Sequence, residues 1–429
     1  MNIALAGFAA VFLLAFFGVP LGIATLLVGV GGFALLRGLD PALEMLAQMI
    51  MDSSANYGMS VLPMFVLMGV FVQKADIVDE LYAAANAWVG HLRGGLAQAT
   101  VLSCALFAAI SGSSIATAAT MSKVSIKPMR GLGYDDRLST GTVASAGVLG
   151  VLIPPSVPLV VFGLLTETDI RKLFIASVVP GLLLAALFFL TVWISVRRNP
   201  ALGPAGPKQP TAVRLKSLKG VWPVLALFTL IMGGLYGGIF TATESAGIGA
   251  AGAFLFGAAR RRITLQVFIA SLVEAGKTTA MIFTIIFGAL VFTNLITLSG
   301  LTGQLVAWIQ GGSMSATGVI LSIGLIYLVM GCFMEGMGLM LLTAPLFAAI
   351  ASQVGIDLVW LGVFVVMMIE IGMLTPPVGM NLFTVKAMCP EVPLSTIVRG
   401  AMPFVVANLV AVVLVCVWPT LALTPVSWF

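Results

Sequence analysis

The second half of the chain repeats the first with a shift of about 220 residues. The shared landmarks are a tryptophan, a glycine, a proline pair and a single proline: Trp88 and Trp308, Gly112 and Glu335-Gly336, Pro154-Pro155 and Pro376-Pro377, Pro180 and Pro403. The offsets differ by only a few residues, so the two copies align with almost no gaps. A repeat of this length predicts two copies of one structural unit rather than a single continuous fold.

The composition places both copies in a membrane. Hydrophobic residues make up 60% of the 429 positions and charged residues only 9%, whereas soluble domains carry about 25% charged residues. The apolar runs are long enough to cross a hydrocarbon core of about 30 Å as helices, and they do not alternate as barrel strands do. We therefore expect an all-α, multi-pass membrane protein. The net charge of +5 is scattered over short loops, which argues against nucleic-acid binding.

Each half divides into the same series of segments. The first half has spans at 3–17 and 20–36, an amphipathic stretch at 40–56, a span from about 59, a re-entrant hairpin at 96–128, a broken span at 138–166 and a last span at 173–196. The second-half counterparts are 221–237, 239–257, 263–276, a span from 279, 316–350, 358–386 and 400–420. Because 40–56 and 263–276 are short and polar, we expect them to lie along the interface as arms between a static frame and a moving core.

The charges indicate how the halves are oriented. A re-entrant hairpin adds no net crossing, so each half crosses an odd number of times and the halves should be inverted. With the N-terminus outside, all of the 21 Lys and Arg except Arg37, Arg171 and Lys172 fall in cytoplasmic segments, as the positive-inside rule predicts. The expected organisation is an inverted repeat at 1–196, a basic cytoplasmic linker at 197–220 and a second inverted repeat at 221–429.

The tip of the first hairpin is the run Ser111-Gly112-Ser113-Ser114. Small residues let the chain turn inside the protein, and carbonyl and hydroxyl oxygens at such a tip are hard ligands for a small cation. Backbone N–H groups at the start of the following helix favour an anion. Taken alone, the motif is equally compatible with close packing of small residues between helices.

The tip of the second hairpin contains Glu335 and Gly336. An ionisable group at membrane depth is costly and therefore indicates a function. Glu370 is a second acidic residue inside an apolar run. Because no Lys or Arg lies inside a core span, an anionic substrate must be balanced by bound cations and helix N-termini. This requirement favours coupling to sodium.

Each half also contains a proline-broken span, at 150–156 and at 372–379. Adjacent prolines remove two N–H donors and push the preceding residue out of the helical conformation, so the helix must break inside the membrane. The freed carbonyls must be buried in protein or line a wet cavity. A single break is explained by a simple kink, but two at equivalent places predict a shared site, which is typical of secondary transporters.

These arguments select a set of candidate substrate-binding residues from the tips, the breaks and the buried acids. They are Ser111, Gly112, Ser156, Glu335, Glu370 and Asn381.

The residues at 238–246, GIFTATESA, resemble the G-I-F-T-x-T-E-A-A signature of the large membrane subunit of TRAP transporters, the tripartite ATP-independent periplasmic carriers. Ser245 stands where alanine is usual. The S-G-S-S tip and the L-I-P-P-S and T-P-P-V-G breaks are also similar to motifs of that family. The resemblance covers essentially the whole chain, and the four motifs together are specific.

The resemblance implies an elevator-type carrier of the ion transporter superfamily in a bacterial inner membrane. It implies sodium-driven import of an organic anion, such as a C4-dicarboxylate or sialic acid, with a small four-helix membrane subunit and a periplasmic substrate-binding protein as partners. It also implies that the tips and breaks form sodium sites. Carried over to this chain, their ligands are Ser111, Ser113, Ser114, Gly150 and Pro154, and Gly336, Thr375, Pro376 and Gly379.

Three alternatives stay open. A carrier or exchanger of the same superfamily would move a carboxylate without partners, and a passive channel would conduct without saturation. An intramembrane enzyme is the third, but the residues that it would need are missing. The single histidine, His91, is expected at a helix end, and paired intramembrane aspartates are absent from the sequence.

Overall fold

In a computed structural model, which describes residues 2–75, 77–308, 311–312 and 314–428, the chain folds into helices joined by short connections. Six helices in this part of the chain are long and apolar enough to cross a membrane, and the bent pair Asp136–Leu152 and Val157–Thr166 makes a seventh candidate. The all-α class predicted from composition is therefore confirmed.

The first half begins with five separate helices and continues with a hairpin, a broken helix and a long helix. These are α1 (Asn2–Phe16), α2 (Leu21–Arg37), α3 (Leu39–Ala55), α4 (Val61–Lys74), α5 (Ile77–Val89), the hairpin α6 (Gly95–Ser111) and α7 (Ser114–Gly131), the broken helix α8 (Asp136–Ala146), α9 (Leu149–Leu152) and α10 (Val157–Thr166), and α11 (Ile170–Arg198). The predicted split before Pro20 separates α1 from α2, with Gly18 at φ 82°, a conformation that glycine adopts without strain.

The second half follows the same plan. Its helices are α12 (Thr211–Tyr236), α13 (Ala242–Ala259), α14 (Leu265–Leu298), α15 (Leu301–Trp308), the hairpin α16 (Ala316–Gly331) and α17 (Gly336–Gln353), the broken helix α18 (Leu358–Leu374) and α19 (Met380–Met388), α20 (Leu394–Val417) and α21 (Thr420–Leu423). Within the predicted linker at 197–220, α11 ends at Arg198, a short 3-10 helix follows at Pro200–Leu202, and α12 begins at Thr211, so the later basic residues of this stretch lie on α12.

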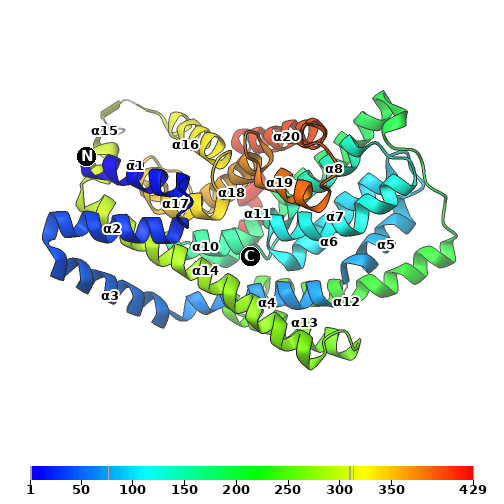
Figure 1. Cartoon of the computed structure of the whole chain (residues 1–429), viewed down its shortest axis with the longest axis horizontal. Helices are drawn as coiled ribbons and strands as arrows, with labels where there is room; N and C mark the ends of the chain where they lie inside the picture. The colour runs from blue at the N-terminus through cyan, green and yellow to red at the C-terminus, as the bar shows by residue number, and fades with distance from the viewer. Residues whose placement is uncertain (1, 76, 309–310, 313, 429) are drawn as a thin grey trace.

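The two hairpins approach the centre of the molecule from opposite ends (Figure 1). α6 and α7 lie on one side of α18, and α16 and α17 lie on the other. Residues of both tips face one central cavity. This opposed arrangement is the one expected of inverted repeats, and the hairpins predicted at 96–128 and 316–350 are confirmed.

Both proline pairs break a helix as predicted. In the first copy the axis bends by 41° between α9 and α10, and Ser156 then accepts the backbone N–H of Leu159 (3.3 Å) to cap α10. In the second copy α18 ends at Leu374 and α19 begins at Met380. The peptide bond between the two prolines is cis in both copies.

The prediction of a separate interfacial segment at 263–276 is wrong. This stretch is the first part of α14, which runs without a break from Leu265 to Leu298. In the first copy α3 does stop, because Asn56 adopts an extended conformation and its Oδ1 accepts the Gly58 N–H (2.8 Å). Between Leu265 and Leu298 no residue forms such a turn, so the helix continues through the polar stretch.

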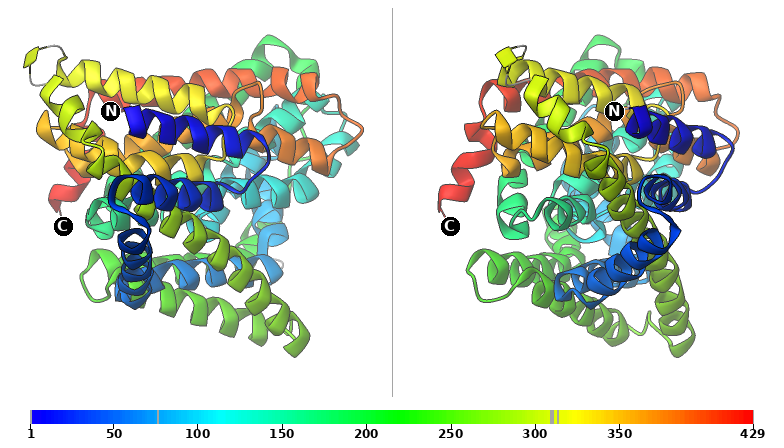
Figure 2. Two further views of the ribbon diagram at one scale, coloured as in Figure 1. Left: turned by 60° about the vertical axis from the view of Figure 1, so that its left-hand side comes forward. Right: turned by 90° about the vertical axis from the view of Figure 1, so that its left-hand side faces the viewer.

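We call α2, α3, α4, α12, α13 and α14 the frame, and the two hairpins with the two broken helices the core. α14 crosses the molecule diagonally, as Figures 1 and 2 show. Its first half packs on α4, where the rings of Phe71 and Phe268 stack at 5.9 Å. Its second half lies against α2, where a Cβ on Gly22 would come within 2.8 Å of the Ile285 backbone. The two halves of the frame are thus joined along one helix.

Candidate functional site at the hairpin tips

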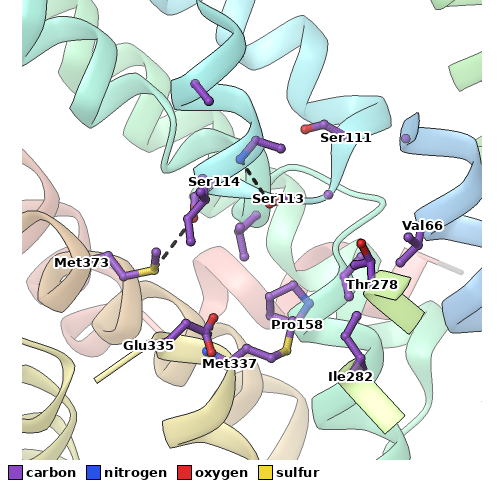
Figure 3. A pocket seen from close by; sticks show the side chains of 18 of the residues that line it. Val66, Ser111, Ser113, Ser114, Pro158, Thr278, Ile282, Glu335, Met337 and Met373 are labelled. Carbon is purple, nitrogen blue, oxygen red and sulfur yellow. Dashed lines mark hydrogen bonds between the residues drawn. The ribbon is translucent and has the colours of Figure 1, made fainter. Parts of the chain in front are cut away.

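A cavity of about 390 Å³ separates the hairpin tips from the frame (Figure 3). Seven of the site residues that the sequence predicted line this cavity: Ser111, Gly112, Ser113, Ser114, Glu335, Gly336 and Glu370. The frame contributes polar side chains from α4 and α14, namely Gln73, Glu274 and Thr278. Most of the remaining wall is apolar, with Val66, Ile282 and Met337 on three different helices. The cavity thus combines an apolar interior with a few polar groups at its ends, as small-molecule sites do.

The other predicted site residues lie outside the lining of this cavity: Gly150, Pro154, Ser156, Thr375, Pro376, Gly379 and Asn381. Ser156 is fully buried and caps α10, as described above. Asn381 is also fully buried, and its Nδ2 donates to the carbonyl oxygen of Ala144 across the core (3.5 Å). The structure therefore assigns these two side chains to the interior of the core and not to the cavity wall.

In the first copy the hairpin tip packs directly on the helix break. A Cβ on Gly112 would lie 3.2 Å from the Pro155 carbonyl oxygen, and Gly112 has φ 60°. A Cβ on Gly150 would lie 2.6 Å from Thr117 Oγ1 and 2.8 Å from the Ser113 carbonyl oxygen. Glycine at these positions lets backbone and hydroxyl oxygens approach one another. Such neutral oxygens are hard donors of the kind that a sodium ion takes.

The second copy repeats this contact with different residues. Gly331, at the end of α16, lies against Gly372 of α18, and the Val378 N–H donates to the Cys332 carbonyl oxygen (3.2 Å). Gly379 has φ 63°, and a Cβ there would lie 3.3 Å from the Thr375 carbonyl oxygen. Tip and break are therefore paired in both halves, which is what the repeat predicted.

The start of α7 is capped by a neutral side chain. Ser113 Oγ accepts the Ala116 N–H (3.3 Å), and Thr117 Oγ1 lies 2.8 Å from Ser111 Oγ. Ser114 points away from this cap and contacts Met373 Sδ of α18 (3.8 Å), as Figure 3 shows. The three serines of the tip thus have three different surroundings.

The start of α17 is capped by a carboxylate. Glu335 accepts the N–H groups of Met337 (3.0 Å) and Gly338 (2.8 Å). The positive end of the helix dipole stabilises such a charge. Part of the reason for an acidic residue at membrane depth is therefore that it completes the N-terminus of this helix.

Glu370 is only partly satisfied, by a hydrogen bond with Ser114 of the first hairpin tip. Its side chain is 2% exposed, it lines the cavity, and its Oε2 has no hydrogen-bond partner within the described part of the chain. A buried polar oxygen without a partner is costly unless a donor or a cation reaches it. Glu370 is therefore the cavity residue that most needs a hydrogen-bond donor or a cation from a ligand.

Sequence reasoning missed the frame side of the cavity. Gln73 Nε2 donates to Thr120 Oγ1 of α7 (3.4 Å), and Glu274 pairs with Lys74 (2.9 Å). The polar residues Gln73, Glu274 and Thr278 stand in or beside apolar helices, which is a weak signal without knowledge of what they face. The prediction that 263–276 was a separate arm also hid the fact that Glu274 and Thr278 follow one another on one helix.

The GIFTATESA stretch has a local structural role. Thr241 Oγ1 accepts the Glu244 N–H (3.2 Å), and Glu244 accepts the Thr241 N–H (2.8 Å), which forms a capping box at the start of α13. Neither residue lines the cavity.

Comparison with known proteins decides the family. Residues 8–421 match the family model described as "Tripartite ATP-independent periplasmic transporter, DctM component". The chain belongs to this family. It is thus a TRAP large permease subunit, and family membership together with its apolar helices makes it a multi-pass protein of the bacterial inner membrane.

Two curated relatives of this TRAP permease align over nearly their full length. It is 37% identical over 401 residues to a C4-dicarboxylate TRAP transporter large permease protein of Pseudomonas aeruginosa, covering 93% of both chains. It is 33% identical over 412 residues to a sialic acid TRAP transporter large permease protein of Vibrio cholerae, covering 96% of this chain and 95% of the other. These relatives are transporter permeases.

A solved structure with low sequence identity supports the fold. The YdaH transporter of Alcanivorax borkumensis superposes with a TM-score of 0.56 at 15% identity, covering 89% of each chain. At this identity the likeness concerns the architecture of the TRAP permease alone.

Proposed function

We propose that the chain is the permease of a sodium-coupled importer of organic anions, such as a C4-dicarboxylate, sialic acid or a similar carboxylate. A periplasmic binding protein delivers the substrate, and a small four-helix membrane subunit completes the transporter. The observation that carries this proposal is the central cavity, where both hairpin tips face the frame across a single chamber. A substrate bound there contacts both inverted repeats at once.

The paired tips and breaks are the proposed sodium sites. Ser111, Ser113, Ser114, Gly150 and Pro154 belong to the first site, and Gly336, Thr375, Pro376 and Gly379 to the second. The oxygens brought together around Gly150 and Gly379 support this assignment. Sodium bound at either site would offset the negative charge of a substrate in a cavity whose described lining contains no Lys, Arg or His.

Transport then follows an elevator scheme, in which the core carries the cavity past the frame. Core and frame also touch beside the cavity, where a Cβ on Gly69 of α4 would lie 3.2 Å from the Ser111 carbonyl oxygen, and the hydrogen bond between Gln73 and Thr120 crosses the same boundary. A boundary with few polar contacts suits sliding.

The test uses proteoliposomes that contain the chain with its small membrane subunit, supplied with the periplasmic binding protein and with radiolabelled succinate or sialic acid. We expect uptake of at least one of these carboxylates with an inward sodium gradient and none when choline replaces sodium. Equal uptake in choline would contradict sodium coupling. Full uptake by the chain without its two partners would instead favour a stand-alone carboxylate carrier.

A further inference from the structure

The two hairpin tips offer a ligand opposite electrostatic surroundings. A helix N-terminus has N–H groups without intrahelical acceptors and attracts an anion. At α7 the cap is neutral, and Ser113 takes only the Ala116 N–H. At α17 the carboxylate of Glu335 already takes the N–H groups of Met337 and Gly338. Of these two helix starts, α7 is therefore the one open to a carboxylate from outside.

The first residues of α7 also face the right space. Ser114 and Ile115 both line the cavity, and their N–H groups lie in the first helical turn, where no carbonyl of the same helix is in position to accept them. The α7 N-terminus thus provides one place for a substrate carboxylate.

The wall formed by α17 and α18 carries acidic side chains instead. Glu335 and Glu370 both line it, and Glu370 Oε2 is buried without a partner in the described chain. Glu274, the third acid in the lining, is already paired with Lys74. Ser114 is hydrogen-bonded to the Glu370 side chain, but none of the lining residues that the structure describes is basic, so no cation of the cavity wall pairs with it.

We propose that the cavity selects a substrate with a single carboxylate and with a positively charged or hydrogen-bond-donating group at its other end. The carboxylate binds at the start of α7, and the donor end meets Glu370. This selectivity rests on the proposed function and narrows its substrate class. The second carboxylate of a dicarboxylate would face Glu335 and Glu370 without a compensating base, and such a like-charge contact is a common way to reject a near-isosteric ligand.

The apolar part of the lining fits the hydrocarbon middle of such a molecule. Met281, Ile282 and Met337 come from both the frame and the core, so the middle of the substrate is covered from two sides. Methionine side chains adapt to ligands of different length.

Matched ligands of equal length test the proposal on the full chain in lipid nanodiscs with sodium chloride. The pairs are succinate and 4-aminobutanoate, glutarate and 5-aminopentanoate, and adipate and 6-aminohexanoate. In each pair an aminomethyl group (–CH2–NH3+) replaces one carboxylate, so that the number of atoms along the chain stays the same. We measure the shift in melting temperature over a ligand titration and derive the Kd. In at least one pair we expect the amino acid to bind about tenfold more tightly, because a charged hydrogen bond to a buried carboxylate has that magnitude.

The variant Glu370→Gln keeps the shape of the side chain and replaces its carboxyl group by an amide. We expect it to lose the preference for the amino acid by about the same tenfold factor. Glu44→Gln is the matched control, because Glu44 is an exposed glutamate on α3 outside the cavity, and this change should leave the preference intact. Titration with sodium chloride distinguishes this role of Glu370 from a role in binding sodium. If Glu370 serves sodium, the variant weakens sodium stabilisation with every ligand and keeps the preference, which overturns the proposal.

Two further outcomes count against the selectivity. One is that dicarboxylates bind as tightly as their amino acid partners, and the other is that no pair raises the melting temperature. Sodium-dependent uptake of succinate in proteoliposomes, combined with the first of these results, would leave the proposed function standing and remove only the inferred substrate class.

Discussion

Gly372 of α18 lies against Gly331 of α16 so closely that a Cβ on Gly372 would be 2.7 Å from the Gly331 Cα. The contact holds the second hairpin tip against the second helix break, as small residues do wherever two membrane helices approach closely. Because the neighbouring atom is backbone, a side chain cannot be accommodated by a change of rotamer. We therefore expect Gly372→Ala to separate tip from break.

The expected cost of Gly372→Ala is about 1–3 kcal/mol of stability, the usual range for overpacking. We also expect the stabilisation by sodium chloride to decrease, because the residues of the second proposed sodium site belong to the tip and the break that this junction holds together. Thermal unfolding with sodium or choline chloride measures both effects. Gly276→Ala on α14 is the control, since a Cβ there meets nothing within 4 Å. Equal behaviour of the two variants would show that the junction is not critical.

Replacing Ser113 and Ser114 together by alanine should abolish uptake in proteoliposomes while the protein still folds. Removing the Ser113 cap should lower the free energy of unfolding by about 1 kcal/mol. Ser315→Ala removes an equivalent cap, since Ser315 Oγ accepts the Gly318 N–H (3.2 Å) at the far end of the other hairpin. This control should lose similar stability and keep transport. Normal sodium-dependent uptake by the double variant would exclude the first sodium site as assigned.

A cross-link between core and frame should stop an elevator. Gln73 of α4 and Thr120 of α7 are hydrogen-bonded across the boundary, so cysteines at both positions should react with a short bis-thiosulfonate reagent. We expect uptake to fall to background and to recover on reduction. Met68 and Gly249 form the control pair, because both belong to the frame and are in contact. A cross-linked Gln73–Thr120 pair that still transports would rule out sliding at this boundary.

The loop before α20 should contribute stability that depends on pH. The backbone N–H of Glu391 and then the Arg130 guanidinium hold the pKa of the Glu391 carboxyl below its usual range. A carboxyl with a lowered folded pKa stabilises the protein above its unfolded pKa of about 4.3, and the contribution is lost as the pH falls through the folded value.

Glu391→Gln should therefore lower the melting temperature at pH 7, and the difference from the natural chain should shrink as the pH falls below about 4. Melting curves in detergent over this range measure the effect. The loop is exposed, so the shift should be small and should decrease further at high salt. A difference that stays constant with pH would show that Glu391 acts through packing alone.

The repeat and the proline pairs were sufficient to predict most of the architecture. Covalent constraints explain this success: a proline pair ends a helix wherever it stands, and a duplicated sequence folds into duplicated elements. The hairpins and both broken helices follow directly. The prediction of a separate segment at 263–276 fails because polarity alone does not end a helix, whereas a residue that forms a competing turn does, as Asn56 shows in the first copy.

The site could be predicted only from the core side. The tips stand out because serine, glycine and glutamate are conspicuous in apolar runs. Their partners Gln73, Glu274 and Thr278 belong to elements far away in the sequence, and only the fold brings them to the cavity. For the same reason the sequence did not distinguish Glu335, which caps its own helix, from Glu370, whose buried oxygen has no partner.

The interruption at Asn56 separates α3 from α4 in the first copy, whereas the corresponding part of the second copy, α14, is one uninterrupted helix. Without a joint, α14 is a single stiff rod of about 51 Å, so a displacement at one end must reach the other. In the first copy, rotation about the backbone at Asn56 would change the angle between α3 and α4 without bending either helix. The two copies therefore differ in stiffness, although their sequences repeat one another.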